Sequence, residues 1–299
     1  MDAGQRKETV RYYPTFSTAI TAARIHLHQY GEWVDPGRWQ GVPTEGKPDL
    51  TTRELLTWGM SVPIWQQGHP ESSGCHLSTN DYLLTTLQHQ IKPSLPWADD
   101  HFEERVSRKP TNPGEAYQTW PWWRGQYDVT ASTQGDDESK DDFRFTHTYQ
   151  ERFWPKQAGH VTDYPHYEDR QGIRYNYGDL DDLVNLLLRD PYTRQAYLPI
   201  FFPEDTGAVH EGRIPCTLGY QFMLRDAKLH LWYFIRSCDY VRHFRDDIYL
   251  ACRLLLWVLD ELQLRDEDTP RSWEDVVPGN LNMTICSLHY HKGDAHLVS

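Results

Sequence analysis

The chain has few cysteines for its 299 residues, and none of the five lies in a CxxC pair. Their number is odd, their spacing is uneven and no leader peptide precedes them, so a disulfide framework is not expected. A chain of this length buries enough apolar surface to fold without a disulfide or a metal. These absences predict a protein of a reducing cytoplasm.

Long apolar runs are also missing. The longest, at residues 254–259, is far shorter than the roughly 20 residues that cross a bilayer. We therefore expect these residues to form the buried face of a helix in a soluble protein.

Clusters of positive charge are absent as well. Lys and Arg number 30 against 43 Asp and Glu, which gives a formal net charge of -13. Binding along a nucleic-acid backbone depends on clustered Lys and Arg that release counterions, so this class of function is not expected. A few arginines could still hold one small phosphate. The 12 tryptophans and 18 tyrosines favour large packing surfaces over base stacking.

Hydrophobic periodicity predicts helices over residues 14–33, 180–188 and 248–262, the second of which is ended by Pro191. A further helix is predicted at residues 50–58. Thr51 or Thr52 would cap it, and Glu54 would lie in its first turn.

Strand-forming residues predict strands at 196–202, 218–224, 229–235 and 283–290, with a hairpin turn at 225–228. Strands beside helices indicate an α+β fold. We expect one domain over residues 1–299. Residues 128–172 contain the acidic stretch 136–142 and are predicted to be a loop-rich insertion.

Two motifs carry the chemistry. Residues 213–222 read Arg-Ile-Pro-Cys-Thr-Leu-Gly-Tyr-Gln-Phe, and residues 236–239 read Arg-Ser-Cys-Asp. This pattern resembles the thymidylate synthase superfamily. The resemblance implies a mixed β-sheet flanked by helices, with the sheet packing at a homodimer interface. It also implies that Cys216 is the covalent nucleophile, that Gln221 lies near the substrate, and that Arg236 and Ser237 bind the nucleotide phosphate.

Further blocks follow the order of the same superfamily. Residues 191–195 resemble its phosphate motif, and Arg194 would reach the phosphate of the neighbouring subunit. Residues 287–291, Ser-Leu-His-Tyr-His, resemble the late histidine motif, so His289 and His291 are expected at the sugar. Asp239 resembles the aspartate that contacts the pterin of the folate. A surface or capping carboxylate is the alternative for Asp239.

Asp247 stands where thymidylate synthases carry an asparagine that reads uracil. Cytosine presents N3 as an acceptor and N4 as a donor, and a protonated carboxyl complements both. An unpaired polar edge in a closed pocket would cost about 1 to 3 kcal/mol. Together with the Cys216-Thr217 pair, this resembles the deoxycytidylate hydroxymethylases. The alternative is an aspartate that only caps its own helix turn.

The chemistry at a pyrimidine C5 needs a thiolate that adds at C6 and makes C5 nucleophilic. Cys216 would supply the thiolate, which the positive charges of Arg236 and Arg194 favour. Glu54 resembles the glutamate that organises water and proton transfers. The other cysteines, namely Cys75, Cys238, Cys252 and Cys286, are expected to be small buried hydrophobes.

The resemblance implies a hydroxymethyltransferase that uses 5,10-methylenetetrahydrofolate on deoxycytidylate or cytidylate, in the cytoplasm of a bacterium or a phage-infected host. Three departures bear on this prediction. Gln195 replaces a second arginine, for which Arg174 or Arg213 could substitute. His291 replaces a tyrosine at the sugar. Only eight residues follow His291, where relatives carry a tail that covers the folate.

Other functions remain open from the sequence. One is a methyltransferase that reduces the transferred group, and another is a non-catalytic relative that only binds nucleotide. A zinc site of His289, His291 and His296 is a further alternative, although no metal is expected. The tryptophans that would stack on the pterin are not assigned among Trp65, Trp97, Trp120, Trp122 and Trp123.

Overall fold

The computed structural model describes residues 10–39, 42–65, 79–122, 145, 147–158, 178–206, 214–266 and 272–298. Within these residues, one seven-stranded mixed sheet forms the centre of the fold. Its strand order is β1-β5-β9-β8-β7-β6, and β2 pairs with β5 beside that path. The strands are β1 (Val10–Tyr12), β2 (Glu32–Val34), β5 (Thr52–Pro63), β6 (Tyr197–Pro199), β7 (Thr217–Arg225), β8 (Lys228–Asp239) and β9 (Val277–His291).

A separate pair, β3 (Arg38–Trp39) and β4 (Val42–Pro43), forms a small ribbon. Short 3-10 turns occur at η1 (Pro48–Leu50), η2 (Ala116–Thr119), η3 (Pro203–Thr206) and η4 (Lys292–Leu297). β8 and β9 run parallel, whereas β5 and β9 run antiparallel. The sheet is therefore mixed, as predicted.

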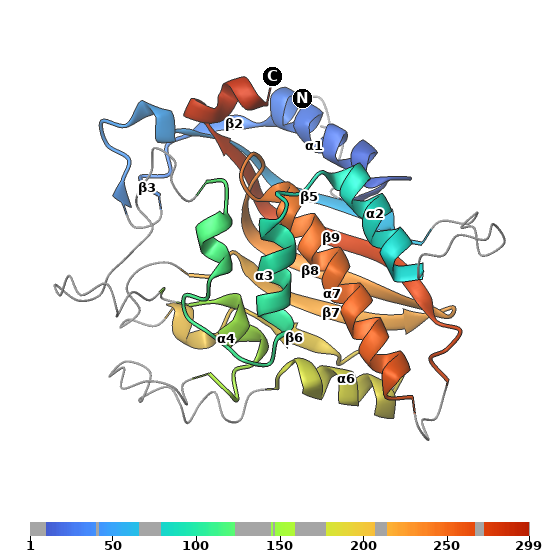
Figure 1. Cartoon of the computed structure of the whole chain (residues 1–299). Helices are drawn as coiled ribbons and strands as arrows, with labels where there is room; N and C mark the ends of the chain where they lie inside the picture. Colours follow the sequence, from blue (N-terminus) through green and yellow to red (C-terminus); the bar gives the residue numbers. More distant parts are fainter. Residues whose placement is uncertain are drawn as a thin grey trace.

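Helices lie across one face of this sheet. Figure 1 shows α3 and α7 next to each other in front of the strands, with α2 and α6 at either side of α7. The α-helices are α1 (Phe16–Tyr30), α2 (Thr79–Ile91), α3 (Trp97–Val106), α4 (Tyr149–Phe153), α6 (Leu180–Arg189) and α7 (Phe244–Leu264). This layering is the predicted α+β architecture.

The predicted helices α1, α6 and α7 are confirmed, because an apolar stripe and an end signal coincide in each. Thr15 and Asp179 cap α1 and α6 by accepting hydrogen bonds from backbone N–H groups in the first turn. Residues 254–259 lie in α7, where all but the partly buried Trp257 are buried. Among the described residues, no helix combines the length and the apolar character that a bilayer crossing requires.

The predicted hairpin is also confirmed. Asp226 and Ala227 link β7 to β8, and both have positive φ angles, of 50° and 56°. Two such residues give a turn whose twist matches that of antiparallel strands. The strand predicted at residues 196–202 is shorter, and only Tyr197–Pro199 belong to the sheet.

The helix predicted at residues 50–58 is wrong, because residues 52–63 form β5. Thr52 pairs with His291 at one end of the strand, and Pro63 pairs with Asn280 at the other. β5 lies inside the sheet, so neighbouring strands satisfy its backbone groups. This long-range pairing outweighs the local signals of a capping threonine and an early glutamate. Glu54 is therefore a strand residue.

A row of irregular positions crosses three neighbouring strands. Thr57 on β5, Cys286 on β9 and Arg236 on β8 lie side by side across the sheet. The residues on either side of each are paired between the strands, but these three are not. Thr57 has a φ of 55°, in the left-handed region. The buried side chains change from Trp58, Ile285 and Ile235 on one side of the row to Leu55, Leu288 and Cys238 on the other. In these three strands, the alternation of buried and exposed side chains therefore reverses at this row.

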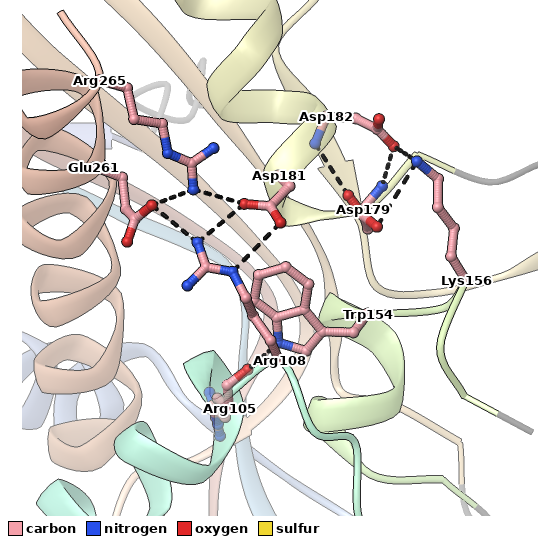
Figure 2. A network of polar contacts seen from close by, with 9 residues as sticks. All are labelled: Arg105, Arg108, Trp154, Lys156, Asp179, Asp181, Asp182, Glu261 and Arg265. Atoms are coloured by element: carbon pink, nitrogen blue, oxygen red, sulfur yellow. Dashed lines mark hydrogen bonds and ion pairs between the residues drawn. The ribbon is translucent and has the colours of Figure 1, made fainter. Parts of the chain in front are cut away.

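Charged contacts fasten the end of α3 to α6 and α7 (Figure 2). Arg108 donates to Asp181 at 3.1 Å and to Glu261 at 2.9 Å, and Arg265 joins both carboxylates. The indole N–H of Trp154 donates to the carbonyl of Arg105 at 2.8 Å. These contacts hold Arg105, in the last turn of α3, in a fixed place.

The predicted insertion at residues 128–172 falls mostly outside the described residues, and the acidic stretch 136–142 lies wholly outside them. The described part contains the short helix α4, whose residues 150–153 are buried. Arg152 pairs with Asp205 there at 2.7 Å, and both side chains are buried. This part of the range is therefore core.

Candidate active site

Cys216 lies exposed immediately before β7. Arg236 of β8 holds the cysteine in place, because Nε donates to the carbonyl of Pro215 at 2.8 Å and Nη2 donates to that of Ile214 at 3.0 Å. Nη2 also lies 3.9 Å from the Cys216 sulfur. A positive charge beside an accessible sulfur favours its thiolate form. The structure therefore brings together the two residues that the motifs paired.

Asp247 lies in the first turn of α7 and is partly exposed. Its Oδ1 accepts from the hydroxyl of Tyr233 at 3.4 Å, and its Oδ2 accepts from the thiol of Cys238 at 3.4 Å. Removal from bulk water raises the pKa of Asp247 to about 7, although the charge of Arg105 acts in the opposite direction. This carboxyl can therefore be neutral or ionised near neutral pH.

A row of hydroxyl groups connects Asp247 with the residue after the cysteine. The Tyr233 hydroxyl lies 2.9 Å from Oγ1 of Thr217, which lies 3.0 Å from the hydroxyl of Tyr149. Arg105 stacks over the ring of Tyr149, with Cζ 4.0 Å from the ring centroid. Sequence reasoning missed Arg105, Tyr149 and Tyr233, because none lies in a motif that it identified.

Glu54, Ser287 and His289 form a second group. The Ser287 hydroxyl donates to Oε1 of Glu54 and lies 3.4 Å from Nδ1 of His289. Glu54 pairs with His289 across β5 and β9, which explains their proximity. All three side chains are partly buried. A carboxylate, a hydroxyl and an imidazole in contact can hold a water molecule and pass protons to it.

Asp239 and His291 are more enclosed. Oδ1 of Asp239 accepts from the backbone N–H groups of Val241 and Arg242, so the residue caps the turn before α7. His291 is 0% exposed, lies 3.7 Å from Oδ2 of Asp239, and has a pKa that burial lowers. Of these two predicted residues, His289 is partly exposed whereas His291 is enclosed.

Within the described part of the chain, one set of ligand atoms could hold a metal ion. Asp239, His289 and His291 each offer one atom within 4.8 Å of the others. The Arg242 guanidinium lies 3.7 Å from Oδ2 of Asp239 and competes with a cation for that carboxylate. His296, which the sequence grouped with the other two histidines, instead contacts the carbonyl of Gly293.

The remaining residues predicted to bind phosphate or substrate lie outside the two groups of contacts described above. Arg194 and Gln195 are exposed, and Ser237 is partly buried beside Ser287. The amide nitrogen of Gln221 contacts the carbonyl of Ala196 at 3.1 Å, and so contributes to the β6–β7 edge. Arg174 and Arg213, which could replace the missing arginine, lie outside the described residues.

The other cysteines differ from one another. Cys238 and Cys252 are buried, as predicted, and burial raises the pKa of both thiols. Cys286 is exposed, so the prediction of a buried hydrophobe is wrong for it. It lies in the irregular row of the sheet, where the side-chain alternation breaks. Cys75 lies outside the described residues.

Comparison with known proteins gives one partial sequence match and a likeness of fold. No protein-family model matches the chain. A protein of Methanosarcina barkeri (strain Fusaro / DSM 804), provisionally named a thymidylate synthase, is 25% identical over 142 residues. The match covers 44% of this chain and 59% of that protein, so the chain spans less than two thirds of its relative.

A solved structure, the thermostable thymidylate synthase A from Bacillus subtilis, matches with a TM-score of 0.58 and 13% sequence identity. The superposition covers 95% of this chain and 82% of the solved one. The chain therefore has a thymidylate synthase-like fold, a mixed sheet flanked by helices.

Proposed function

We propose that this protein is a one-carbon transferase that acts at C5 of a pyrimidine nucleotide. The observation that carries the proposal is the exposed Cys216, whose sulfur lies 3.9 Å from the Arg236 guanidinium in a thymidylate synthase-like fold. The partial match to a provisionally named thymidylate synthase supports the same class of reaction.

Cys216 acts first. Its thiolate bonds to C6 of the pyrimidine, and the electrons of the C5–C6 double bond move to make C5 nucleophilic. C5 would then bond to the transferred carbon, and the bond from that carbon to its carrier would break as C5 loses its proton. Water adds to the exocyclic carbon that results, and the sulfur leaves C6 as the C5–C6 double bond re-forms. Glu54, held by Ser287, positions a water molecule for the proton transfers and for its addition to the exocyclic carbon.

The transferred carbon would come from 5,10-methylenetetrahydrofolate, which supplies a one-carbon unit at the oxidation level of formaldehyde. Trp97 and Trp120 could offer their indole N–H groups to such a flat heteroaromatic group. Their ring centroids are 5.9 Å apart, each ring already stacks on a histidine, and among the described residues neither indole nitrogen has a hydrogen-bond partner. Asp239 would contact the group through Oδ2, because the turn before α7 already uses Oδ1.

Asp247 selects a cytosine base in this proposal. Its neutral carboxyl donates to N3 and accepts from N4, whereas an ionised carboxyl can only accept. A pKa of about 7 keeps the neutral form available at physiological pH. Deoxycytidylate and cytidylate are the proposed substrates, and a 5-hydroxymethyl nucleotide is the proposed product.

The phosphate would be held by Arg236 and Ser237 of one subunit and Arg194 of the other. Arg194 is exposed on the described surface, as a residue that serves a neighbouring subunit must be. Side chains such as Trp232, Phe234 and Met223 remain partly exposed on their strands. Because burial of apolar surface drives association, this sheet face suits a homodimer interface.

Incubation with deoxycytidylate or cytidylate labelled with tritium at C5, together with formaldehyde and tetrahydrofolate, tests the proposal. Release of tritium by the wild type, with a 5-hydroxymethyl product, is the expected result. Absence of release from cytosine and uracil nucleotides alike would overturn it. A methyltransferase would instead form a 5-methyl product and dihydrofolate, and a binding protein would bind nucleotide without turnover.

A further inference from the structure

The hydroxyl row behind Cys216 has a defined order. Tyr149 of α4 contacts Thr217 at 3.0 Å, Thr217 contacts Tyr233 of β8 at 2.9 Å, and Tyr233 contacts Oδ1 of Asp247 at 3.4 Å. Thr217 is completely buried, and Tyr233 is 2% exposed. Each hydroxyl has one hydrogen to donate, so a Tyr233 that donates to Asp247 can only accept from Thr217, and a Thr217 that donates to Tyr233 can only accept from Tyr149.

A buried cation, Arg105, lies over the ring of Tyr149 at the end of the row farthest from Asp247. Arg105 is 5% exposed and takes part in no ion pair within the described chain. Its Nη2 lies 3.0 Å from Nε2 of His101, and its Nε has no hydrogen-bond partner among the residues that the structure describes. Burial and the charge of Arg105 lower the pKa of His101 to about 4. His101 is therefore neutral and accepts from Arg105 through Nε2.

This arrangement fixes the direction of the row. A guanidinium over the ring face of Tyr149 makes its O–H a better donor, because the cation stabilises electron density on the phenol. Burial raises the pKa of both Tyr149 and Tyr233, so both keep their protons. Tyr149 thus donates to Thr217, Thr217 donates to Tyr233, and Tyr233 donates to Asp247.

We propose that Tyr149, Thr217 and Tyr233 form a hydrogen-bond relay, fixed by Arg105, that keeps Oδ1 of Asp247 an acceptor and places the acid hydrogen on Oδ2. The relay acts through hydrogen-bond direction alone, and no covalent bond forms or breaks. It deepens the proposed function, because it decides which oxygen of Asp247 faces N3 of cytosine and which faces N4. Tyr233 is a positioning residue in this scheme.

Other groups around Asp247 do not supply this direction. The thiol of Cys238 lies 3.4 Å from Oδ2, but S–H is a weak donor. Tyr220 of β7 stacks on Tyr233 with ring centroids 4.6 Å apart, and its hydroxyl also hydrogen-bonds with the hydroxyls of Tyr233 and Thr217, so it joins the row from the side. Asp246, the preceding residue of α7, accepts from the backbone N–H and the hydroxyl of Ser94. Arg105 is a cation whose charge acts on Asp247 and favours its ionised form.

The titration of Asp247, followed by NMR of carboxyl-labelled aspartate, tests the relay without any ligand. The signal is assigned by its loss in Asp247→Asn. Wild type should titrate near 7. Tyr233→Phe removes a donor that favours the ionised form, so the midpoint should rise by about half a unit to one unit. Thr217→Val should raise it less, because it weakens the donor indirectly.

Two further variants separate the relay from a general loss of structure. Tyr249→Phe is the matched control, since Tyr249 is a buried tyrosine of α7 whose hydroxyl contacts Asp99 and Gln88 instead. It should leave the midpoint unchanged. Arg105→Met should raise the midpoint, and Arg105→Lys should restore it. A Tyr233→Phe midpoint equal to that of wild type would overturn the relay.

Nucleotide binding forms the second arm. Tyr233→Phe should lower the affinity for deoxycytidylate about tenfold and leave that for deoxyuridylate nearly unchanged. If wild type binds neither nucleotide, the proposed function is overturned. The titration of Asp247 then still tests the relay, because it needs no ligand. If Tyr233→Phe shifts the titration but both affinities fall equally, the assignment of the two oxygens to N3 and N4 is overturned.

Discussion

The sulfur of Cys216 lies 3.9 Å from Nη2 of Arg236, and the same guanidinium holds the two carbonyls that precede the cysteine. One side chain therefore positions the proposed nucleophile and supplies a positive charge that favours its thiolate. The bond from the Arg236 N–H to the Cys216 carbonyl, at 2.9 Å, adds a backbone connection. Substitution of either Cys216 or Arg236 is therefore expected to lower activity.

Cys216→Ser should lower kcat for C5 tritium release by about a thousandfold or more, because a neutral hydroxyl is a much weaker nucleophile. Mass spectrometry with a 5-fluoropyrimidine nucleotide should show a covalent adduct on wild type and none on the variant. Cys286→Ser is the control, since Cys286 is also exposed but lies on β9. Equal losses in both variants would contradict the assignment.

Asp247→Asn should change base preference from cytosine towards uracil. The amide donates where uracil accepts at O4 and accepts where uracil donates at N3, so the ratio of affinities should change by about ten- to a hundredfold. Calorimetric titration with deoxycytidylate and deoxyuridylate measures it. Cytosine binding by wild type should weaken as the pH rises through 7, because the neutral carboxyl is lost. An unchanged ratio would argue that Asp247 only caps its helix.

The same substitution should alter the pH dependence of stability. The pKa of Asp247 is about 7 in the folded protein and about 3.9 in an unfolded chain. The folded state thus binds more protons between these values, and the free energy of unfolding falls as the pH rises from about 4 to about 7. Asp247→Asn lacks this loss. Its Tm relative to wild type should be higher at pH 8 than at pH 5, by thermal denaturation.

Glu54→Gln should lower kcat by about a hundredfold with little change in KM. The amide still accepts from Ser287, but it cannot take up or release a proton. Steady-state kinetics with the C5-labelled nucleotide give both values. Ser287→Ala, which leaves the carboxylate in place, should be less severe. If the Glu54→Gln variant kept the full kcat, Glu54 would have only a structural role.

Mixed dimers test whether Arg194 serves the neighbouring subunit. If it does, a dimer of Cys216→Ala and Arg194→Ala chains has one site with both lesions and one intact site. Random pairing of two inactive chains should then recover about one quarter of wild-type activity. No recovery on mixing would place Arg194 in the site of its own chain, or remove it from the reaction.

The parts of the fold that local patterns determine were predictable from the sequence. α6 and α7 each carry an apolar stripe, and the Asp226–Ala227 turn suits a hairpin. β5 was mispredicted because its stability comes from pairing with β9, more than 200 residues away in the chain. Thr51, Thr52 and Glu54 resemble the start of a helix whether or not partner strands exist.

The candidate site divides in a similar way. A motif predicts Cys216 and Arg236, and the structure places them in contact. The contact between Tyr149 and Thr217 joins residues 68 positions apart, and no periodicity marks either tyrosine of the relay among the 18 in the chain. Such contacts depend on how α4 packs against the sheet, which single-sequence patterns do not encode.

The irregular row formed by Thr57, Cys286 and Arg236 divides β5, β9 and β8 into two segments each. Odd-numbered and even-numbered positions exchange their buried and exposed roles between the two segments. A relative that straightened only one of these strands would turn that strand's site residues towards the wrong layer. The three positions should therefore vary in concert during evolution. Their covariation would identify distant homologues even where identity is too low for the catalytic motifs to be aligned.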